Sequence, residues 1–428
     1  MKQVGRNFTA GLMILFCVAF SAAATESFHW RTNQNRVDAE IQNWTLPILL
    51  EKISAATGWE IYVEPSAAHK VSAKFKDVSS TEALKLLLGD LNYALVAGTN
   101  SAPKFFVYRT SREDATQLIH QTKLAKDQRI LNELILTLKP GSRASIEELA
   151  QKLGGKIVGR AEDLNAYRLR FKDETAAQAA RELVQTKHDI AVDSNYSFDR
   201  PSPTEMASLP ASASLNLKPN NGSGSQITVA LIDTGLGSIG PDLASYLLPG
   251  VSVAGESSGS GEALTHGNSM AQIIAQGGNN IKILPIDVYG PNGSTTSFEV
   301  AKGAIAAMDA GAQFYNLSLG GAGGNDDFLH SVLQRIYSQG GTIFAAAGNE
   351  PTTAPVFPAA WNEVTAVTAG NRDGSIASYA NRGSFVDVIA PGQAIVKANG
   401  EFFRVSGTSA STALVTGQAA ATAASKRK

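Results

Sequence analysis

The stretch QITVALIDTG, residues 226–235, decides the fold class of the chain. Ile227–Ile232 is a continuous apolar run, which predicts a strand buried on both faces, as in a parallel sheet. Asp233, followed by Thr234-Gly235, closes this strand. Because α/β sheets present functional groups at the carboxyl ends of their strands, Asp233 stands where a site is expected. The structural alternative is an aspartate that only caps a loop.

Downstream of this strand, apolar strand patterns alternate with helical patterns. This alternation is typical of an α/β domain with a doubly wound parallel sheet, and residues 226–428 are predicted to form it. We expect strands at 281–288, 314–319 and 342–346, and helices at 266–276, 298–310, 326–338 and 408–424.

Two further residues complete a candidate nucleophilic site. His266 and His330 are the two histidines after residue 222, and His330 lies in an amphipathic pattern that predicts a boundary residue. His266 is therefore the candidate base. Ser409 follows Gly407-Thr408 at the start of the last helix, where free backbone N–H groups favour a nucleophile. Each residue alone is more readily a structural histidine or an N-cap serine, but the order Asp, His, Ser is a known order of a catalytic triad.

Six segments resemble, in family order, the signature blocks of the subtilase family of serine endopeptidases: ALIDTG (230–235), THGNSMA (265–271), NLSLGG (316–321), AAAGN (345–349), APG (390–392) and SGTSAS (406–411). The resemblance implies a subtilisin-like fold and peptide hydrolysis through an acyl-enzyme. Asp233 would orient His266, and His266 would take the proton of the attacking Ser409. The Asn349 side chain and the Ser409 backbone N–H would stabilise the oxyanion.

The resemblance also implies a substrate cleft. Ser318-Leu319-Gly320 resembles the segment that pairs with the substrate backbone, and Gly293-Ser294 resembles the strand on the other side, so a peptide would bind by strand addition. Gly348 belongs to a run of small residues that leaves room for a substrate side chain. Glu350 is either a rim residue that favours a basic side chain or, by the stronger interpretation, a solvated glutamate.

The pattern departs from the family after the nucleophile. The run 410–413 reads ASTA where the family usually has Met-Ala and soon afterwards Pro, and the domain is predicted to be short at its C-terminus. We expect no metal ligand set and no cofactor for the chemistry. A structural calcium ion is left open, with Asp242 as a weak candidate ligand.

Two small α+β domains are predicted to precede the catalytic domain. Residues 130–198 show the order βαββαβ and resemble the propeptide of subtilases, which implies a folding helper and inhibitor. Residues 25–110 resemble the short N-terminal domain of secretins and TonB-dependent receptors, with a generic α/β module as an equal alternative. The polar stretch 111–129 is predicted to be a connector, and 199–225, rich in Pro, Ser and Gly, a flexible linker.

The N-terminus predicts export. Lys2 and Arg6 precede an apolar run from Phe8 to Phe20 that is short for a membrane span, so residues 1–24 are interpreted as a signal peptide, with an uncleaved anchor as the alternative. The only cysteine, Cys17, lies within it, which leaves the exported chain without a disulfide or a thiol site. We expect a secreted or periplasmic protein.

These patterns predict a secreted serine endopeptidase made as a self-processing zymogen. It would act on peptide or protein substrates and bind its own propeptide, with self-cleavage between Ser197 and Ser225. A net charge of −1, without a basic stripe, argues against a nucleic-acid partner. The alternative is a catalytically inactive binding or assembly module of a cell-envelope complex, with residues 25–110 contacting an envelope partner. An esterase is disfavoured because the Gly-x-Ser-x-Gly motif and its chain order are missing.

Overall fold

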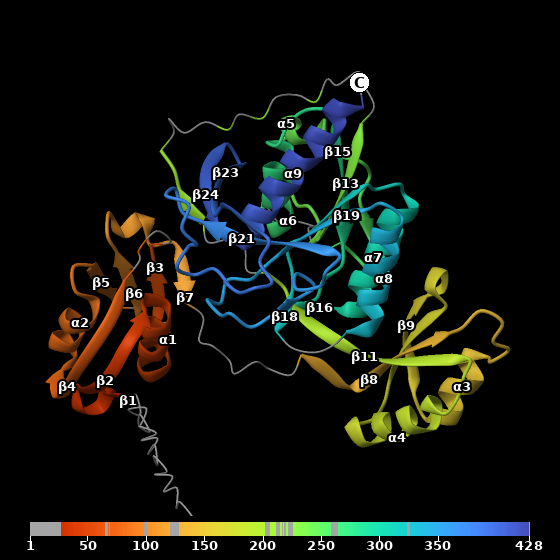
Figure 1. Cartoon of the computed structure of the whole chain (residues 1–428), viewed down its shortest axis with the longest axis horizontal. Helices are drawn as coiled ribbons and strands as arrows, with labels where there is room; N and C mark the ends of the chain where they lie inside the picture. Colours follow the sequence, from red (N-terminus) through yellow and green to blue (C-terminus); the bar gives the residue numbers. More distant parts are fainter. Residues whose placement is uncertain are drawn as a thin grey trace, which may run out of the picture.

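The computed structural model places three domains, which are named here by their order in the chain. The first domain comprises residues 27–119, the second domain 129–199 and the C-terminal domain 226–427. The first and second domains lie on opposite sides of the C-terminal domain in the view of Figure 1. The structure describes residues 27–427 apart from 65–66, 68, 98–101, 120–127, 202–205, 211–214, 216, 218–219, 221–225, 258–263 and 323–325.

The predicted signal peptide and Cys17 lie outside the described residues. Within residues 27–427, gaps excepted, no helix has the length and apolar character that a membrane crossing requires.

The C-terminal domain is built around a seven-stranded sheet in which all neighbouring strands are parallel. The strands, in sheet order, are β14 (Val251–Ser252), β15 (Ile281–Asp287), β13 (Ile227–Asp233), β17 (Phe314–Leu317), β19 (Thr342–Ala346), β21 (Val364–Gly370) and β22 (Val388–Pro391). This architecture confirms the predicted doubly wound sheet. Strand β13 contains the continuous apolar run from which a buried parallel strand was predicted.

Helices cover both faces of this sheet, and each face has its own hydrophobic core. On one face lie α7 (Ser297–Asp309) and α8 (Asp327–Ser338), and on the other α6 (His266–Ala275) and α9 (Thr408–Lys426). Burial on both sides explains why the strands lack polar alternation. A hairpin of β23 (Gln393–Ala398) and β24 (Glu401–Ser406) leads directly into α9. The short elements are α5 (Pro241–Ala244), β18 (Gly321–Ala322) and β20 (Val356–Phe357).

The second domain shows the predicted βαββαβ order. Its elements are β8 (Arg129–Leu138), α3 (Ile146–Leu153), β9 (Lys156–Ala161), η3 (Glu162–Leu164), β10 (Ala166–Arg170), α4 (Glu174–Gln185) and β11 (Ile190–Asp199). Strand β11 continues beyond its own domain and pairs antiparallel with β16 (Ser294–Thr296) of the C-terminal domain. The result is a five-stranded sheet, in the order β16-β11-β8-β10-β9, that is shared by two domains.

The first domain has two sheets around a common core. One contains β1 (Ser27–Arg31), β2 (Arg36–Thr45) and β4 (Lys70–Ser79), with η1 (Thr32–Gln34) between the first two. The other has the order β5 (Asn92–Val96), β6 (Lys104–Tyr108), β3 (Glu60–Val63) and β7 (Gln117–Ile119). Helices α1 (Leu46–Thr57) and α2 (Ser80–Leu88) complete the core, and η2 (Arg112–Asp114) precedes β7.

The domain boundaries differ from the predicted ones in two places. The first domain extends beyond residue 110, because β7 pairs with β3 in the register Val63↔Gln117, so residues 111–119 are not a free connector. The predicted linker 199–225 contains β12 (Met206–Ser208), which pairs antiparallel with β24. A polar or Pro/Ser-rich composition predicts a loop. Whether such a segment pairs as a strand depends on a partner strand elsewhere in the fold, and composition does not reveal that partner.

Candidate active site

Asp233 ends β13 and His266 begins α6, and the fold brings the two side chains together. Nδ1 of His266 lies 2.8 Å from Oδ1 and 2.9 Å from Oδ2 of Asp233. Both residues are almost fully buried, with 1% and 4% exposure for Asp233 and His266. Because Nδ1 of the imidazole donates to the carboxylate, the ring orientation is fixed and Nε2 is the nitrogen that remains for chemistry.

A glycine allows this close approach of α6 to β13. A Cβ atom on Gly267 would lie 2.3 Å from the backbone oxygen of Thr234, so no other residue fits after His266 without displacing the strand end. The Gly267 N–H donates to Thr234 Oγ1 at 2.9 Å, and the Thr234 N–H donates to Asp233 Oδ1 at 2.7 Å. Thr234 and Gly267 therefore hold the Asp–His pair in register.

Ser409 is the second residue of α9 and lines a cavity of about 450 Å³ together with His266. Gly407, which precedes α9, has a φ of +142°, a conformation that favours glycine. Among the described residues, no hydrogen bond joins Ser409 to His266. Such bonds are often long in unliganded sites and shorten when substrate binds. The structure thus places Ser409 and His266 at one cavity, with Asp233 behind His266.

Asn349 lines the same cavity with its side chain held from behind. Its Oδ1 accepts hydrogen bonds from the Thr408 N–H at 2.8 Å and from Thr408 Oγ1 at 3.0 Å. The Gly348 N–H donates to Thr408 Oγ1. The hydroxyl proton of Thr408 is therefore directed to Asn349 Oδ1. The amide oxygen is therefore fixed toward Thr408, and the Nδ2 donor is left for the space beside Ser409. Thr408 was not among the predicted site residues, although it directly precedes Ser409.

The predicted substrate-binding residues fall into two groups. Ser318, Leu319, Gly320 and Gly348 line the same cavity as His266 and Ser409, and so does the exposed Glu350. Gly293 does not line the cavity, but its carbonyl oxygen accepts a hydrogen bond from the Arg200 N–H at 2.9 Å.

Polar side chains connect this cleft to the last helix. Ser318 Oγ accepts from Asn316 Nδ2 at 3.0 Å, and Asn316 Oδ1 accepts from Thr416 Oγ1 at 3.1 Å. Ser411 Oγ donates to the backbone oxygen of Pro391 at 3.0 Å. These bonds satisfy the buried hydroxyl groups of Ser411 and Thr416 in α9.

The end of the second domain forms part of the cleft wall. Asp199, Arg200 and Pro201 line the cavity that also contains His266 and Ser409. Upstream of them, β11 pairs with β16 in the register Asp199↔Ser294. The chain thus enters the cleft as an added antiparallel strand, which is the binding mode expected for an extended peptide.

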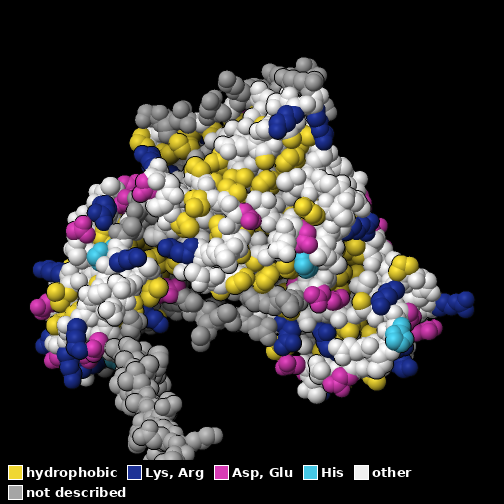
Figure 2. All heavy atoms as spheres, viewed as in Figure 1, with side chains coloured by type: hydrophobic (Ala, Val, Ile, Leu, Met, Phe, Trp, Pro, Cys, Tyr) yellow, Lys and Arg dark blue, Asp and Glu magenta, His cyan; other side chains and the backbone are white. Residues whose placement is uncertain are grey.

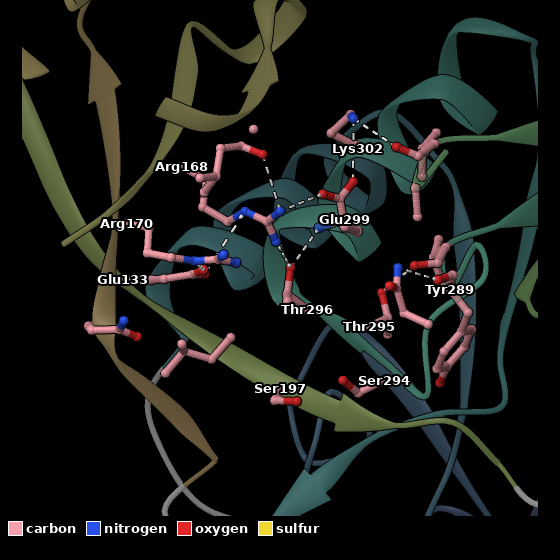
Figure 3. A pocket seen from close by; sticks show the side chains of 18 residues that line it. Glu133, Arg168, Arg170, Ser197, Tyr289, Ser294, Thr295, Thr296, Glu299 and Lys302 are labelled. Atoms are coloured by element: carbon pink, nitrogen blue, oxygen red, sulfur yellow. Dashed lines mark hydrogen bonds and ion pairs between the residues drawn. The ribbon is translucent and has the colours of Figure 1, made fainter. Parts of the chain in front are cut away.

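The second domain also contacts the C-terminal domain through a charged cavity of about 690 Å³, shown in Figure 3. Arg168 of β10 extends to the start of α7, with Nη1 donating to Thr296 Oγ1 at 3.2 Å and Nη2 lying 3.5 Å from Glu299 Oε1. Glu299 also lies 3.3 Å from Lys302 Nζ. On the side of the second domain, Arg170 Nε donates to Glu133 Oε1 at 2.8 Å.

Two further side chains of β11 face the helices of the C-terminal domain. Asn195, fully buried, accepts at Oδ1 from the Phe298 N–H at 3.2 Å and so caps the start of α7. Asp193 lies near the N-terminus of α8. Burial and the charge of Asp327 raise the pKa of Asp193 to about 6. Burial likewise raises the pKa of Asp326 to about 6, with the charges of Asp193 and Asp327 adding to the effect.

Two predicted peripheral residues lie away from the cavity. His330 Nε2 lies 3.0 Å from Glu363 Oε2, and its ring stacks on Trp361, so it is the boundary residue that was predicted. Asp242 is exposed on α5. In the part of the chain that the structure describes, no group of three or more His, Cys, Asp or Glu side chains is arranged to hold a metal ion.

Comparisons with known proteins agree with this geometry. Residues 224–427 match the model of the subtilase family, and residues 115–191 match the fervidolysin N-terminal prodomain. Thermitase of Thermoactinomyces vulgaris is 35% identical over 208 residues, covering 46% of this chain and 74% of that protein. Subtilisin E of Bacillus subtilis (strain 168) is 28% identical over 303 residues, covering 66% of this chain and 77% of that protein.

Solved structures show the same fold. The crystal structure of fervidolysin from Fervidobacterium pennivorans, a keratinolytic enzyme related to subtilisin, has a TM-score of 0.54 at 21% identity and covers 68% of this chain and 54% of that one. The epidermin leader peptide processing serine protease of Staphylococcus aureus has a TM-score of 0.51 at 19% identity, covering 67% of this chain and 87% of that one.

Proposed function

The chain belongs to the subtilase family, and from this premise we propose that it is an exported, self-processing zymogen whose serine endopeptidase site consists of Asp233, His266 and Ser409. The observation that carries the proposal is the buried Asp233–His266 pair, which adjoins the cavity that Ser409 lines. A structural histidine or an N-cap serine would need no such convergence at the carboxyl ends of the strands.

The residues divide the chemistry as follows. His266 Nε2 accepts the proton of Ser409 Oγ while this oxygen attacks the scissile carbonyl carbon, and Asp233 stabilises the imidazolium that forms. His266 then gives the proton to the leaving amine, which leaves an acyl-enzyme on Ser409. Water hydrolyses the acyl-enzyme by the same proton transfers in reverse order. The proposed chemistry draws on protein groups alone.

The oxyanion would be stabilised by Asn349 Nδ2 and the Ser409 backbone N–H. Support comes from the two hydrogen bonds that Thr408 makes to Asn349 Oδ1, because they direct the amide donor before substrate arrives. Such preorganised donors stabilise the transition state more than the ground state. Thr408 is a positioning residue in this scheme, since it acts through Asn349.

The substrate class is an extended peptide or protein segment. The backbone of residues 197–200 pairs with β16 and Gly293, and a substrate would replace it there. Backbone pairing demands little of the substrate sequence. The second domain would therefore act as an inhibitor that holds its own C-terminal end in the cleft.

The register of this strand narrows the proposed self-cleavage to a bond between Pro201 and Met206. Residues up to Pro201 line the cavity with Ser409, whereas Met206–Ser208 already form β12 on β24. Asn220 further ties the chain to the C-terminal domain, since its Nδ2 donates to the Ile281 carbonyl at 2.6 Å. A cut between residues 201 and 206 would keep both attachments, whereas a mature start near Ile227 would lose them.

N-terminal sequencing of the secreted protein and of its Ser409→Ala variant tests the proposal. The wild type should begin between residues 202 and 206, and the variant should keep residues from near Thr25. Equal processing of both proteins would assign the cut to another protease. An uncut wild type with full peptidase activity would remove the second domain from its inhibitory role.

The alternative, an inactive binding module of the cell envelope, is not favoured, because the relatives named above are proteases. An envelope partner for residues 25–110, and the resemblance of this segment to secretin and TonB-receptor domains, stay predictions. A binding assay between residues 25–110 and a purified cell-envelope protein would test both predictions.

A further inference from the structure

The first domain contacts the C-terminal domain beside the cleft, at strand β24. Nη1 of Arg404 in β24 lies 2.6 Å from Oδ1 of Asp114 in η2. The two side chains are 31% and 32% exposed, so the pair is partly shielded from water. Burial alone would raise the pKa of Asp114, but hydrogen bonds from Arg404, Ser111 and Thr110 hold this pKa below its usual value. The carboxylate is therefore charged whenever the pair forms near neutral pH.

This contact lies close to the reacting residues. Strand β24 ends at Ser406, and Gly407-Thr408-Ser409 follows without a gap. Gln117 of β7, three residues after Asp114, lines the cavity that contains His266 and Ser409. A second, smaller cavity lies between the first domain and the turn that carries Asn349. Gln117 lines it on one side, and Asn349 and Glu350 line it on the other.

Gln117 is held in this place by its own domain. Its strand pairs with β3 in the register Val63↔Gln117, so the first domain's sheet sets its position. The side chain is 3% exposed, and its Oε1 has no hydrogen-bond partner among the described residues. A buried amide oxygen without a partner carries a desolvation cost, which the packing of the first domain at this place has to offset.

The two N-terminal domains therefore approach one cleft from two directions. The second domain lines the β16 side with residues 199–201, and the first domain contacts the β24 side through Asp114 and Gln117. In Figure 1 the two domains flank the C-terminal domain, and Figure 2 shows from the same side that most charged side chains lie on these flanking domains.

We propose that the first domain is a second inhibitory unit, which closes the β24 side of the active-site cleft through the Asp114–Arg404 ion pair and the Gln117 side chain. The proposal rests on the proposed peptidase function, because the cleft it closes is the substrate cleft. After self-cleavage, the cleaved N-terminal fragment would still contact the enzyme at two places at once. Its second contact would then form at a high effective concentration, and release of the inhibitor would be slow.

The experiment uses full-length protein and exchanges the two charges. We expect D114R and R404D each to shorten the lag between secretion and the appearance of peptidase activity by roughly three- to tenfold, the range expected for a partly shielded ion pair turned into a repulsion. The double variant D114R/R404D restores the pair with reversed polarity and should restore the lag. R404D leaves the first domain unaltered, so its effect cannot come from misfolding of that domain.

E113R is the matched control. Glu113 is the neighbour of Asp114, its side chain is 72% exposed, and its ion partner is Arg112 of the same domain. Its lag should equal that of the wild type. Unchanged lags in D114R and R404D, or a double variant no slower than the singles, would overturn the proposal. An unchanged lag with reduced turnover of long peptides in D114R would also overturn it, because the first domain would then be a substrate-binding wall.

A second measurement separates this proposal from the peptidase function. In a Ser409→Ala background no self-cleavage occurs, and amide hydrogen exchange of β7 and β24 reports docking directly. D114R should raise exchange in both strands, and the charge swap should return it to the starting level. If the wild type proved inactive but D114R opened these strands, the proposed function would fail while the docking contact stood. If exchange did not change, the docking contact would fail while a wild type active on peptides kept the proposed function.

Discussion

The two sides of the cleft are closed in different ways. On the β16 side the closing segment is a strand, and backbone groups make the contacts, from Ser197↔Thr296 to the hydrogen bond between Arg200 and Gly293. On the β24 side the first domain makes its contact through side chains, chiefly the Asp114–Arg404 pair. Backbone pairing depends little on side-chain identity or salt, whereas an ion pair depends on both. The first kind of contact suits a segment that is to be cut, and the second suits a domain that is to be released.

The strongest intervention removes the chemistry and leaves both closures in place. His266→Ala should lower turnover by about 10⁶, because the nucleophile loses its base. Amide exchange of β16 and β24 should stay as in the uncut chain. Residual hydrolysis within tenfold of the wild type would contradict the triad assignment.

The next largest effect is expected at the oxyanion site. It should leave the contacts on the β16 side and the β24 side of the cleft unchanged. Asn349→Ala should lower kcat by about 10²–10³ with KM nearly unchanged, because the amide donor acts mainly in the transition state. Thr408→Val, which removes the hydroxyl donor to Asn349, should shift kcat in the same direction by a smaller factor. Steady-state kinetics of the processed enzyme decide this. A change confined to KM would assign Asn349 to substrate binding instead.

The β16 side should respond to pH. The docked Asp193 has its pKa raised to about 6, against 3.8 for a free aspartate, so docking takes up a proton. Docking of the second domain should therefore be strongest below about pH 4 and weaken as pH rises through about 6, by up to about 100-fold in the docking constant. Arg181 opposes this shift, and the group lies near Asp327 at the start of α8 and near Asp326, the N-cap residue of that helix.

The measurement is amide exchange of β16 in the Ser409→Ala chain at pH 5 and pH 8, corrected for intrinsic exchange rates. Asp193→Asn is the control, and it should flatten the pH dependence. An equal pH dependence in both chains would show that another group is responsible.

The smallest effect should be a salt effect that acts on one side only. Raising the salt concentration from about 0.1 M to about 1 M reduces the Debye length from about 10 Å to about 3 Å, which should open the β24 side by a few-fold. The β16 ladder should not change. Exchange of β24 and β16, measured in the same samples, gives both values. Equal responses would remove the distinction between the two closures.

The sequence was most informative where the chain is most buried. The apolar run before Asp233, Gly407 before Ser409 and the Gly after His266 each reflect a local steric demand, and the structure has the corresponding strand, positive φ and close approach. Such local steric demands can be recognised from residues that are adjacent in the sequence. The order βαββαβ of the second domain was likewise visible in capping residues such as Ser145, which accepts from the Glu148 N–H.

Contacts between distant segments were out of reach. Nothing near Met206 indicates a partner in β24, and nothing near Asp114 indicates Arg404, because pairing depends on where the fold places the other segment. The same holds for Asn195, whose neighbours in the sequence give no sign that it caps a helix of another domain. Composition alone therefore favoured a connector and a linker at positions where the chain is docked.

Strand β12 has a practical consequence for anyone who expresses the processed enzyme. In the sheet β12-β24-β23, β24 is the middle strand only while β12 is present. A gene that starts at Gln226 would leave unpaired the backbone groups of β24 that face β12, along a sheet edge that leads to Ser409, and open edges recruit other chains. We expect such a recombinant protein to aggregate, whereas one that starts at Ser202 should remain monodisperse in light scattering. Fusion tags belong ahead of Ser202 for the same reason.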